Sequence, residues 1–281
     1  MSLHQPVMVE EVSRFVRNEG ILVDATVGTG GHTLFLLARY PKLRAICLDR
    51  DRESLEVARQ RLAEMEGRVK FLHEDYRRLP RMDIPWEEVT AVLVDMGFSS
   101  FQLSSPRGFS YQRDELLDMR FNREEGVPAW EFLRVVPFSQ LVLLFRDYAD
   151  LRRAEALARE VLRTRPRTTG QLVEAVKRVY RRVRPELLSR VFQAIRIGVN
   201  RELEGLGDFI LGLARKMAKG ARLIFLTYHS GEDRLVKNSL REAFQQGLFK
   251  NLTPRVLRPS PSEVKGNPRA RSARMRVAEK C

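Results

Sequence analysis

Apolar and polar positions alternate in a regular way through the first third of the chain. Short apolar runs end in polar residues near positions 21–25, 45–49, 69–73 and 91–95, which predicts four strands. Between these runs, Leu34–Tyr40 and Asp51–Met65 have apolar residues at helical spacing. Strands that alternate with helices are typical of a parallel sheet with crossover helices. The pattern therefore predicts an α/β fold for this part of the chain.

The middle of the chain has a different pattern. No strand pattern is evident in residues 112–206, and helical spacing is found at Pro128–Arg134, Phe138–Arg163, Thr169–Arg182 and Pro185–Leu206. An apolar strand returns at Arg222–Thr227, and a helix is predicted over residues 231–246. We therefore predict that residues 1–111 and 207–281 form one sheet domain. Residues 112–206 are predicted to form a helical domain inserted between the fourth and fifth strands.

The C-terminal segment is predicted to complete the sheet. Leu252–Val256 and Arg274–Ala278 have strand patterns and could pair as an antiparallel hairpin. The Arg-, Pro- and Ser-rich stretch of residues 255–274 is predicted to be a loop.

A glycine turn follows the first predicted strand. The run Gly28-Thr-Gly30-Gly31 lies between a strand and a helix, and Asp49 ends the second strand 19 residues beyond Gly30. Nucleotide-binding sheets place a carboxylate on ribose hydroxyls at about this interval. The later glycine of the dinucleotide motif and the lysine of the P-loop motif are both missing here. S-adenosylmethionine therefore fits the turn better than NAD or ATP does, although any α/β domain can contain such a turn.

Charge is distributed unevenly along the chain. The formal net charge is +14. Residues 1–103 contain 14 basic and 16 acidic side chains, whereas residues 151–281 contain 30 basic and 12 acidic ones. Clustered basic side chains attract phosphate backbones regardless of their sequence. The charge pattern therefore predicts a nucleic acid as partner.

Cysteine, histidine and hydropathy patterns exclude several classes of protein. Cys47 and Cys281 are the two cysteines, and neither they nor the four histidines show metal-ligand spacing. No apolar run approaches the ~20 residues of a membrane span. We expect a cytoplasmic protein without a metal site or a membrane segment.

Motifs along the whole chain resemble those of the bacterial 16S ribosomal RNA cytosine-N4 methyltransferase family. They are His4-x-Pro6-Val7, Asp24-Ala-Thr-Val-Gly-Thr-Gly-Gly-His32, Asp49-Arg-Asp51, Asp95-Met-Gly-Phe-Ser-Ser-Phe-Gln102, Arg107-Gly-Phe-Ser-Tyr111, Leu117-Asp-Met-Arg120, Phe192-Gln-Ala-Ile-Arg-Ile197, Val199-Asn-Arg-Glu-Leu203, His229-Ser-Gly-Glu-Asp-Arg234 and Asn267-Pro-Arg-Ala-Arg-Ser272. The resemblance implies a Rossmann-like S-adenosylmethionine-dependent methyltransferase sheet with an inserted all-helical, substrate-recognition domain. It also implies that a cytidine in the decoding region of the small ribosomal subunit is the substrate.

The resemblance also implies roles for individual residues. Those implied to bind S-adenosylmethionine are Gly30, Gly31 and His32 at its methionine end, Asp49 on its ribose, Tyr76 beside its adenine, and Asp95 and Gln102. The position of Asp49 at a strand end agrees with this implication. His32 could instead satisfy neighbouring backbone groups, and Asp51 is expected to cap the following helix.

Methyl transfer to a cytosine amine requires little covalent chemistry from the protein. The sulfonium donor is already activated, so the protein mainly positions the amine and accepts its proton. Asp95 is the candidate for this acceptor, for a cofactor ligand, or for both. His229 is a weaker candidate, because a structural hydrogen-bonding role would explain it equally well. Arg269 and Arg271 are candidate RNA contacts, although they could instead hold down the C-terminal hairpin.

Departures from the family motifs leave two alternatives open. Gly231 stands where leucine is usual, Phe101 where proline is common, and Ala149-Asp150-Leu151 replaces Gly-Glu-Glu. A methyltransferase of another RNA or DNA site is one alternative. A non-catalytic RNA-binding assembly factor is the other, although the retained glycine turn, Asp49, Asp95 and Gln102 argue against it.

Overall fold

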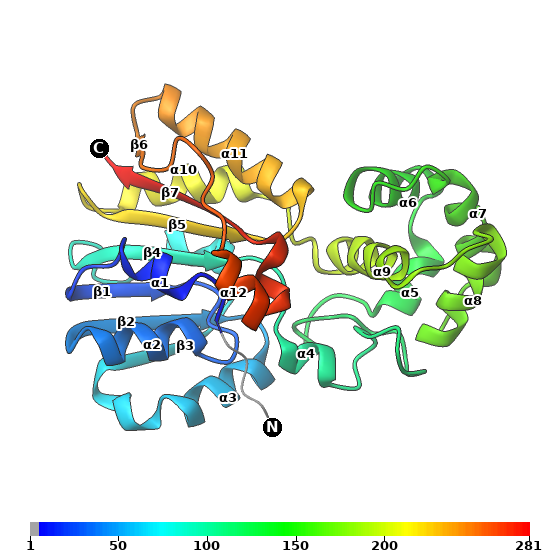
Figure 1. Cartoon of the computed structure of the whole chain (residues 1–281), viewed down its shortest axis with the longest axis horizontal. Helices are drawn as coiled ribbons and strands as arrows, with labels where there is room; N and C mark the ends of the chain where they lie inside the picture. Colours follow the sequence, from blue (N-terminus) through cyan, green and yellow to red (C-terminus); the bar gives the residue numbers. More distant parts are fainter. Residues whose placement is uncertain (1–5) are drawn as a thin grey trace. The chain divides into compact units, whose positions relative to one another are not determined.

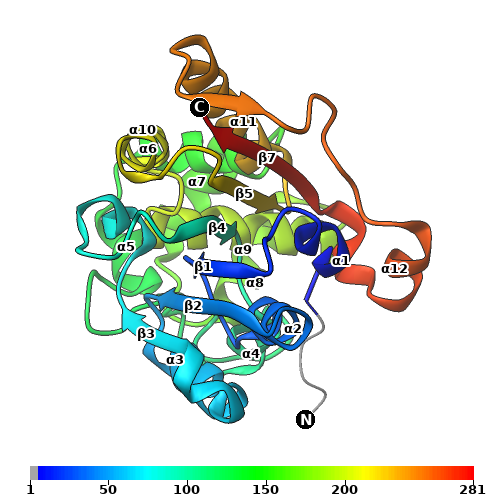
Figure 2. The ribbon, with the colours of Figure 1, turned by 90° about the vertical axis from the view of Figure 1, so that its left-hand side faces the viewer.

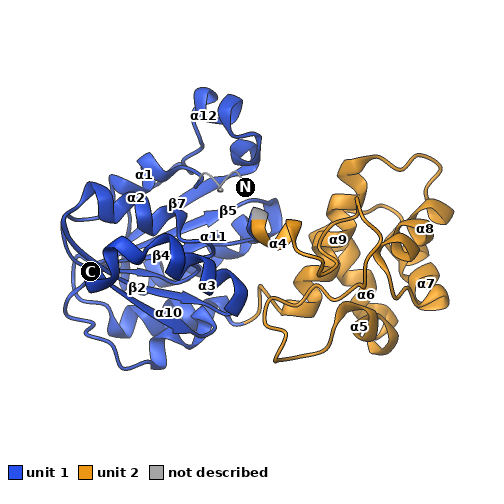
Figure 3. Ribbon diagram, turned by 90° about the horizontal axis from the view of Figure 1, so that it is seen from below, with its two compact units in different colours: residues 1–99, 205–281 blue, residues 100–204 orange. Residues whose placement is uncertain are grey.

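The computed structural model describes residues 6–281, so His4 of the first motif lies outside the described residues. The chain divides into two compact units. Unit 1 consists of residues 1–99 and 205–281, and unit 2 of residues 100–204, shown in blue and orange in Figure 3. The helical unit thus begins at Ser100, earlier than the predicted boundary at residue 112, because the short helix α4 (Ser100–Ser104) belongs to it.

Unit 1 contains one seven-stranded sheet (Figure 1). The strands are β1 (Glu19–Asp24), β2 (Lys42–Asp49), β3 (Val69–His73), β4 (Val89–Asp95), β5 (Arg222–Thr227), β6 (Phe249–Asn251) and β7 (Arg274–Lys280). Their order is β3-β2-β1-β4-β5-β7-β6. The first five strands are parallel, and β7 runs antiparallel to both β5 and β6. The predicted Rossmann-like α/β fold is confirmed.

Helices cover both faces of this sheet because its strands are apolar on both sides. On β4, Ala91 and Leu93 belong to a core cluster that also includes Leu36 and Leu37, whereas Val92 and Val94 point to the opposite face. Figure 2 shows α1 (Val9–Ser13) and α2 (Gly31–Arg39) on one side and α10 (Leu206–Lys216) on the other. The remaining segments of unit 1 are α3 (Arg52–Arg61), α11 (Ser230–Gln245), α12 (Pro261–Gly266) and the short turns η1 (Ala63–Arg68), η2 (Tyr76–Arg81) and η4 (Pro268–Ser272).

Unit 2 is helical and has its own core. Its helices after α4 are α5 (Ala129–Val135), α6 (Phe138–Leu143), the π-helical turn η3 (Leu144–Tyr148), α7 (Ala154–Thr164), α8 (Thr169–Val179) and α9 (Pro185–Asn200). Phe145, Leu157 and Val191 are fully buried in a single cluster. An independent core explains why this segment can interrupt the sheet sequence without disturbing the strand order.

Four predicted segments need correction. The single helix predicted over Phe138–Arg163 is broken, because Asp150 adopts a left-handed φ of 50° between η3 and α7. Pro185–Leu206 is also not one helix: Arg201 has a φ of 50° and ends α9, so that α10 begins separately. The strand that pairs with β7 is Phe249–Asn251 and not Leu252–Val256, and the residue after that segment, Leu257, forms an isolated bridge with Met275. The predicted loop of residues 255–274 contains α12 and η4.

Candidate active site

The carboxyl ends of four parallel strands lie together at one edge of the unit 1 sheet. Asp24 ends β1, Asp49 ends β2, Asp95 ends β4, and Tyr228 follows β5 directly. Strand order reverses at this edge, because β2 and β4 flank β1. Open α/β sheets bind ligands outside the carboxyl ends at such a reversal. This edge is therefore the candidate active site.

The glycine turn between β1 and α2 leaves space beside the sheet edge. Gly28 and Gly30 have positive φ values of 52° and 80°, which glycine adopts without steric cost. A Cβ atom at Gly30 would meet Leu62 Cδ1 at 3.2 Å, whereas one at Gly28 would have no atom within 4 Å. Gly31 begins α2. The turn thus packs tightly against α3 at Gly30 and is open at Gly28.

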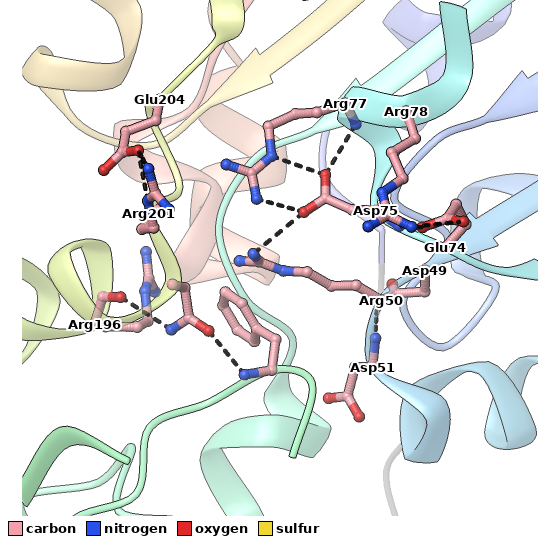
Figure 4. Close-up of polar contacts among 12 residues, drawn as sticks. Asp49, Arg50, Asp51, Glu74, Asp75, Arg77, Arg78, Arg196, Arg201 and Glu204 are labelled. Atoms are coloured by element: carbon pink, nitrogen blue, oxygen red, sulfur yellow. Dashed lines mark hydrogen bonds and ion pairs between the residues drawn. The ribbon is translucent and has the colours of Figure 1, made fainter. Parts of the chain in front are cut away.

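Backbone groups hold the carboxylate of Asp49. Its Oδ2 accepts a hydrogen bond from the Gly28 amide and its Oδ1 from the Asp51 amide, each at 2.8 Å; the contact with Asp51 is drawn in Figure 4. Burial nevertheless raises the pKa of Asp49 to about 6. Each carboxylate oxygen has two lone pairs, so one acceptor position remains on each for a ligand. Asp51 caps α3 as predicted, by accepting from the Glu53 and Ser54 amides.

An ion-pair cluster lies beside Tyr76. Asp75 contacts Arg50 Nη1 at 3.6 Å and accepts from Arg77 Nε at 2.9 Å (Figure 4). Burial acts to raise the pKa of Asp75, but the hydrogen bonds from Arg77 outweigh it and the pKa is lowered. Tyr76 begins η2, and its ring packs edge-on against Phe209 of α10, with 4.9 Å between the centroids. The ring of Tyr76 is thus positioned by packing.

Asp95 is held by side chains. The Tyr228 hydroxyl donates to Asp95 Oδ1 at 2.8 Å, and the Asp95 amide donates to the hydroxyl of Thr26 at 2.7 Å. His32 Nδ1 lies 3.6 Å from Asp95 Oδ2. Burial raises the pKa of Asp95 to about 7, although the hydrogen bond from Tyr228 acts to lower it. A carboxyl group of this pKa exchanges protons near neutral pH, as a general acid or base requires.

Asp24 and His32 extend this group of buried polar side chains. Thr33 donates its hydroxyl hydrogen to Asp24 Oδ2 at 2.6 Å, and burial raises the pKa of Asp24 to about 6. His32 Nε2 lies 2.8 Å from the carbonyl oxygen of Val7, and burial lowers the pKa of His32. The backbone contact predicted as an alternative for His32 is therefore present.

His229 caps a helix. Its Nδ1 accepts from the Glu232 amide at 3.2 Å, which makes it the N-cap of α11, and its Nε2 lies 2.7 Å from Glu232 Oε1. The buried carboxylate of Glu232 also accepts from the Tyr228 amide at 2.9 Å. The N-cap contact accounts for Nδ1 of His229, whereas its buried Nε2 has no hydrogen-bond partner within the described residues.

The remaining predicted residues are not part of this group. Gln102 is buried on α4 of unit 2. Arg269 and Arg271 are exposed on η4, on either side of the fully buried Ala270. Among residues 6–281, no cluster of three or more His, Cys, Asp or Glu side chains could hold a metal ion, and no helix is long and apolar enough to span a membrane.

Two residues of the site were missed by the sequence analysis as candidates. Asp24 ends β1 just as Asp49 and Asp95 end their strands, so the rule that singled out those two also applies to it. Tyr228 follows the fifth strand at the corresponding position. A systematic search of strand ends would have found both residues.

Comparison with known proteins identifies the family. The profile of the MraW methylase family matches residues 1–281. The chain belongs to the MraW methylase family. It is 38% identical to the ribosomal RNA small subunit methyltransferase H of Thermotoga neapolitana, over 98% of this chain and 95% of that protein. It is 36% identical to the protein of the same name from Trichodesmium erythraeum, over 99% of both chains. Among solved structures, a putative methyltransferase from Streptococcus mutans in complex with SAH covers 98% of this chain and 96% of its own, with 13% identity and a TM-score of 0.46.

The family match confirms the predicted resemblance and the predicted class of enzyme. The chain is a methyltransferase of the MraW family, and its matched region includes every strand end at the candidate active site. The roles assigned above to individual residues stay predictions.

Proposed function

We propose that this MraW family member transfers a methyl group from S-adenosylmethionine to the N4 amine of a cytidine in 16S rRNA of the small ribosomal subunit. The match of the family profile to the whole chain carries this proposal. Two curated relatives named ribosomal RNA small subunit methyltransferase H align over nearly their full lengths, which supports the same substrate. Small ribosomal subunits are assembled in the cytoplasm, and we propose that the enzyme acts there.

The residues at the sheet edge fit S-adenosylmethionine. Asp49 has a free acceptor position on each oxygen for the two ribose hydroxyls, and the open space beside Gly28 admits a ligand close to the backbone. Tyr76 offers an aromatic face at the end of the neighbouring strand. Gly30, Gly31 and His32 form the start of α2, where we place the methionine end. When bound, S-adenosylmethionine supplies an activated methyl group.

We assign to Asp95 the acceptance of the amine proton. The lone pair of a cytosine N4 amine is delocalised into the ring, so an acceptor beside the amine makes it a better nucleophile. Asp95 ends the central strand β4 next to the glycine turn, and its pKa of about 7 lets it take up a proton at physiological pH. His229 caps α11 with its Nδ1 atom, and we give it no chemical role.

RNA binding is assigned to basic residues other than the strand-end side chains of the candidate active site. Residues 151–281 have 30 basic side chains against 12 acidic ones, an excess that attracts phosphates. We propose that Arg269 and Arg271 on the exposed turn η4 contribute phosphate contacts. Unit 2 is proposed to recognise the RNA around the target base, and Gln102 is kept as a proposed ligand of S-adenosylmethionine.

Incubation with methyl-labelled S-adenosylmethionine and small subunits from a strain lacking the enzyme tests the proposal. We expect label on a single cytidine of 16S rRNA, identified as N4-methylated by mass spectrometry of nucleosides. Small subunits from the parent strain serve as the control, because their site is already methylated and should take up little label. Label in DNA, in another RNA or on another base would replace the proposed substrate. No label in any nucleic acid would favour a non-catalytic assembly factor.

A further inference from the structure

Tyr228 is fixed at both of its ends in the candidate active site. Its amide donates to Glu232 Oε2 at 2.9 Å, and its hydroxyl donates to Asp95 Oδ1 at 2.8 Å. Its ring lies against Gly97, where a Cβ atom would be 3.3 Å from Tyr228 Cδ2. A tyrosine held by its backbone, its ring and its hydroxyl has one orientation. It therefore presents a fixed donor to one oxygen of Asp95.

The other carboxylate oxygen of Asp95, Oδ2, faces the Nδ1 atom of His32, which is a hydrogen-bond acceptor. His32 Nε2 lies 2.8 Å from the Val7 carbonyl oxygen, which only accepts hydrogen bonds, so Nε2 must carry the ring hydrogen. Burial lowers the pKa of His32 and so favours the neutral ring, in which Nδ1 then has a lone pair and no hydrogen. His32 Nδ1, 3.6 Å from Asp95 Oδ2, therefore donates nothing to that oxygen. Within the described residues, Oδ2 receives no hydrogen bond from another side chain.

We propose that Tyr228 is a positioning residue for the methyl transfer, since its hydrogen bond to Oδ1 reserves Oδ2 of Asp95 for the proton of the substrate amine. This inference rests on the proposed function. The amine nitrogen forms its bond to the methyl carbon while the bond from that carbon to the donor sulfur breaks. The electron pair of the broken bond stays on sulfur, which leaves as the neutral thioether of S-adenosylhomocysteine, and the nitrogen becomes positively charged. Its N–H bond then breaks, the electron pair stays on nitrogen, and the proton forms an O–H bond at Oδ2. The protonated Oδ2 faces His32 Nδ1, which is an acceptor for that hydrogen.

Charged and titratable groups from four further elements surround this pair. Besides Asp95 on β4 and Tyr228 after β5, they are Asp24 on β1, His32 on α2, Glu232 on α11 and Glu263 on α12. Burial, and then the charge of Asp95, raise the pKa of Tyr228 well above its usual value, so its hydroxyl keeps its hydrogen and remains a donor. The hydrogen bond stabilises the charged form of Asp95, and its loss should raise the pKa of that carboxyl group.

The variant Tyr228→Phe removes only the hydroxyl and keeps the ring against Gly97. Tyr40→Phe is the matched control, because the Tyr40 hydroxyl donates to the Ser13 carbonyl oxygen, a backbone group, at 2.8 Å. The first measurement is the carbon NMR titration of the Asp95 carboxyl group in the free protein, assigned with Asp95→Asn. We expect its midpoint to rise by about one pH unit in Tyr228→Phe and to stay unchanged in Tyr40→Phe.

The second measurement is the single-turnover rate of methylation between pH 5.5 and 9 with both substrates saturating. For Tyr228→Phe we expect a rate about fivefold lower near pH 7 that recovers as the pH rises, with an unchanged affinity for S-adenosylhomocysteine. A purely structural tyrosine would lower the thermal stability and leave both pH profiles in place, and this result would overturn the proposal. A shifted NMR titration with an unshifted pH profile of the rate would also overturn the proposal, because the ionisation of Asp95 would then not affect the rate of methyl transfer. If the wild-type protein methylates no RNA, the proposed function fails, while the NMR comparison still reports whether Tyr228 sets the proton affinity of Asp95.

Discussion

Asp49 and Asp95 occupy similar places in the fold but are held in different ways. Both end parallel strands of the unit 1 sheet at the same edge, and burial raises the pKa of each. Asp49 is held by two backbone amides, from Gly28 and Asp51. Asp95 is held by the hydroxyl of Tyr228, a side chain that evolution can replace.

The difference matches two kinds of task. Backbone amides have fixed positions and no titration of their own, so they fix the direction of the Asp49 oxygens, as the recognition of two hydroxyl groups requires. A side-chain donor can tune the proton affinity of its partner, which suits a group that takes up and releases protons. We therefore expect Asp49 to act in binding and Asp95 in the reaction.

The largest expected effect is that of Asp95→Asn on the reaction. This change keeps the size of the side chain and removes the proton acceptor. We expect the single-turnover rate at saturating S-adenosylmethionine to fall by about 10²- to 10⁴-fold, the contribution of a positioned acid–base group. The affinity for S-adenosylmethionine, measured by calorimetry, should change much less. Full recovery of the rate at saturating cofactor would make Asp95 a cofactor ligand like Asp49 and remove the contrast.

Stability should depend on pH through the same carboxyl group. The pKa of Asp95 is about 7 in the folded protein, against 3.8 for an ordinary aspartate. Between these values the folded protein keeps a proton that the unfolded chain has released, so the free energy of unfolding falls as the pH rises. At about 1.36 kcal/mol per pH unit, the loss over this whole interval amounts to about 4 kcal/mol.

Urea unfolding of wild-type protein and Asp95→Asn between pH 4.5 and 8 measures this effect. The wild-type protein should lose stability relative to the variant as the pH rises through this range. His32, whose pKa is lowered by burial, contributes a trend of opposite sign below pH 6.5 that is common to both proteins. Parallel curves for the two proteins would mean that Asp95 is already ionised at low pH.

The sequence predicts features that depend on neighbouring residues better than it predicts contacts between residues far apart in the chain. The strand ends at Asp49 and Asp95 were predictable because an apolar run and its polar end are local. The break before α7 was not predictable, because aspartate adopts left-handed backbone more often than most residues but does not require it, so Asp150 alone does not mark the break. The partnership of Tyr228 with Asp95 joins residues 133 positions apart, and the sheet topology alone brings them together. Local pattern thus predicted the candidate residues, and only the fold revealed their partners.

The variant Asp49→Ala tests the proposed role of Asp49 in binding S-adenosylmethionine. We expect the affinity for S-adenosylmethionine to fall by about 1.5–3 kcal/mol, the range of a hydrogen bond to a charged group. Asp51→Ala is a suitable control, because Asp51 caps α3 from the neighbouring position and its loss should cost about 1 kcal/mol of stability without this loss of affinity. Calorimetric titration gives both affinities. Equal losses in the two variants would indicate general damage to the β2–α3 turn.

The smallest effect is expected for the two exposed arginines of η4, the turn that precedes β7. Replacing Arg269 and Arg271 with Gln should weaken RNA binding about tenfold at moderate salt. The salt slope, which is the slope of the logarithm of the RNA-binding constant against the logarithm of the salt concentration, should become shallower by up to about one for each phosphate that is no longer neutralised. The matched control is the double replacement of Arg39 and Arg78, exposed arginines that pair with Glu10 and Glu74. RNA affinity measured at several salt concentrations should change in the first variant and barely in the control, and neither should alter S-adenosylmethionine binding. A lower melting temperature with an unchanged salt slope would instead show that the two arginines secure η4 beside β7, in which case the RNA-binding residues must be sought elsewhere on the chain.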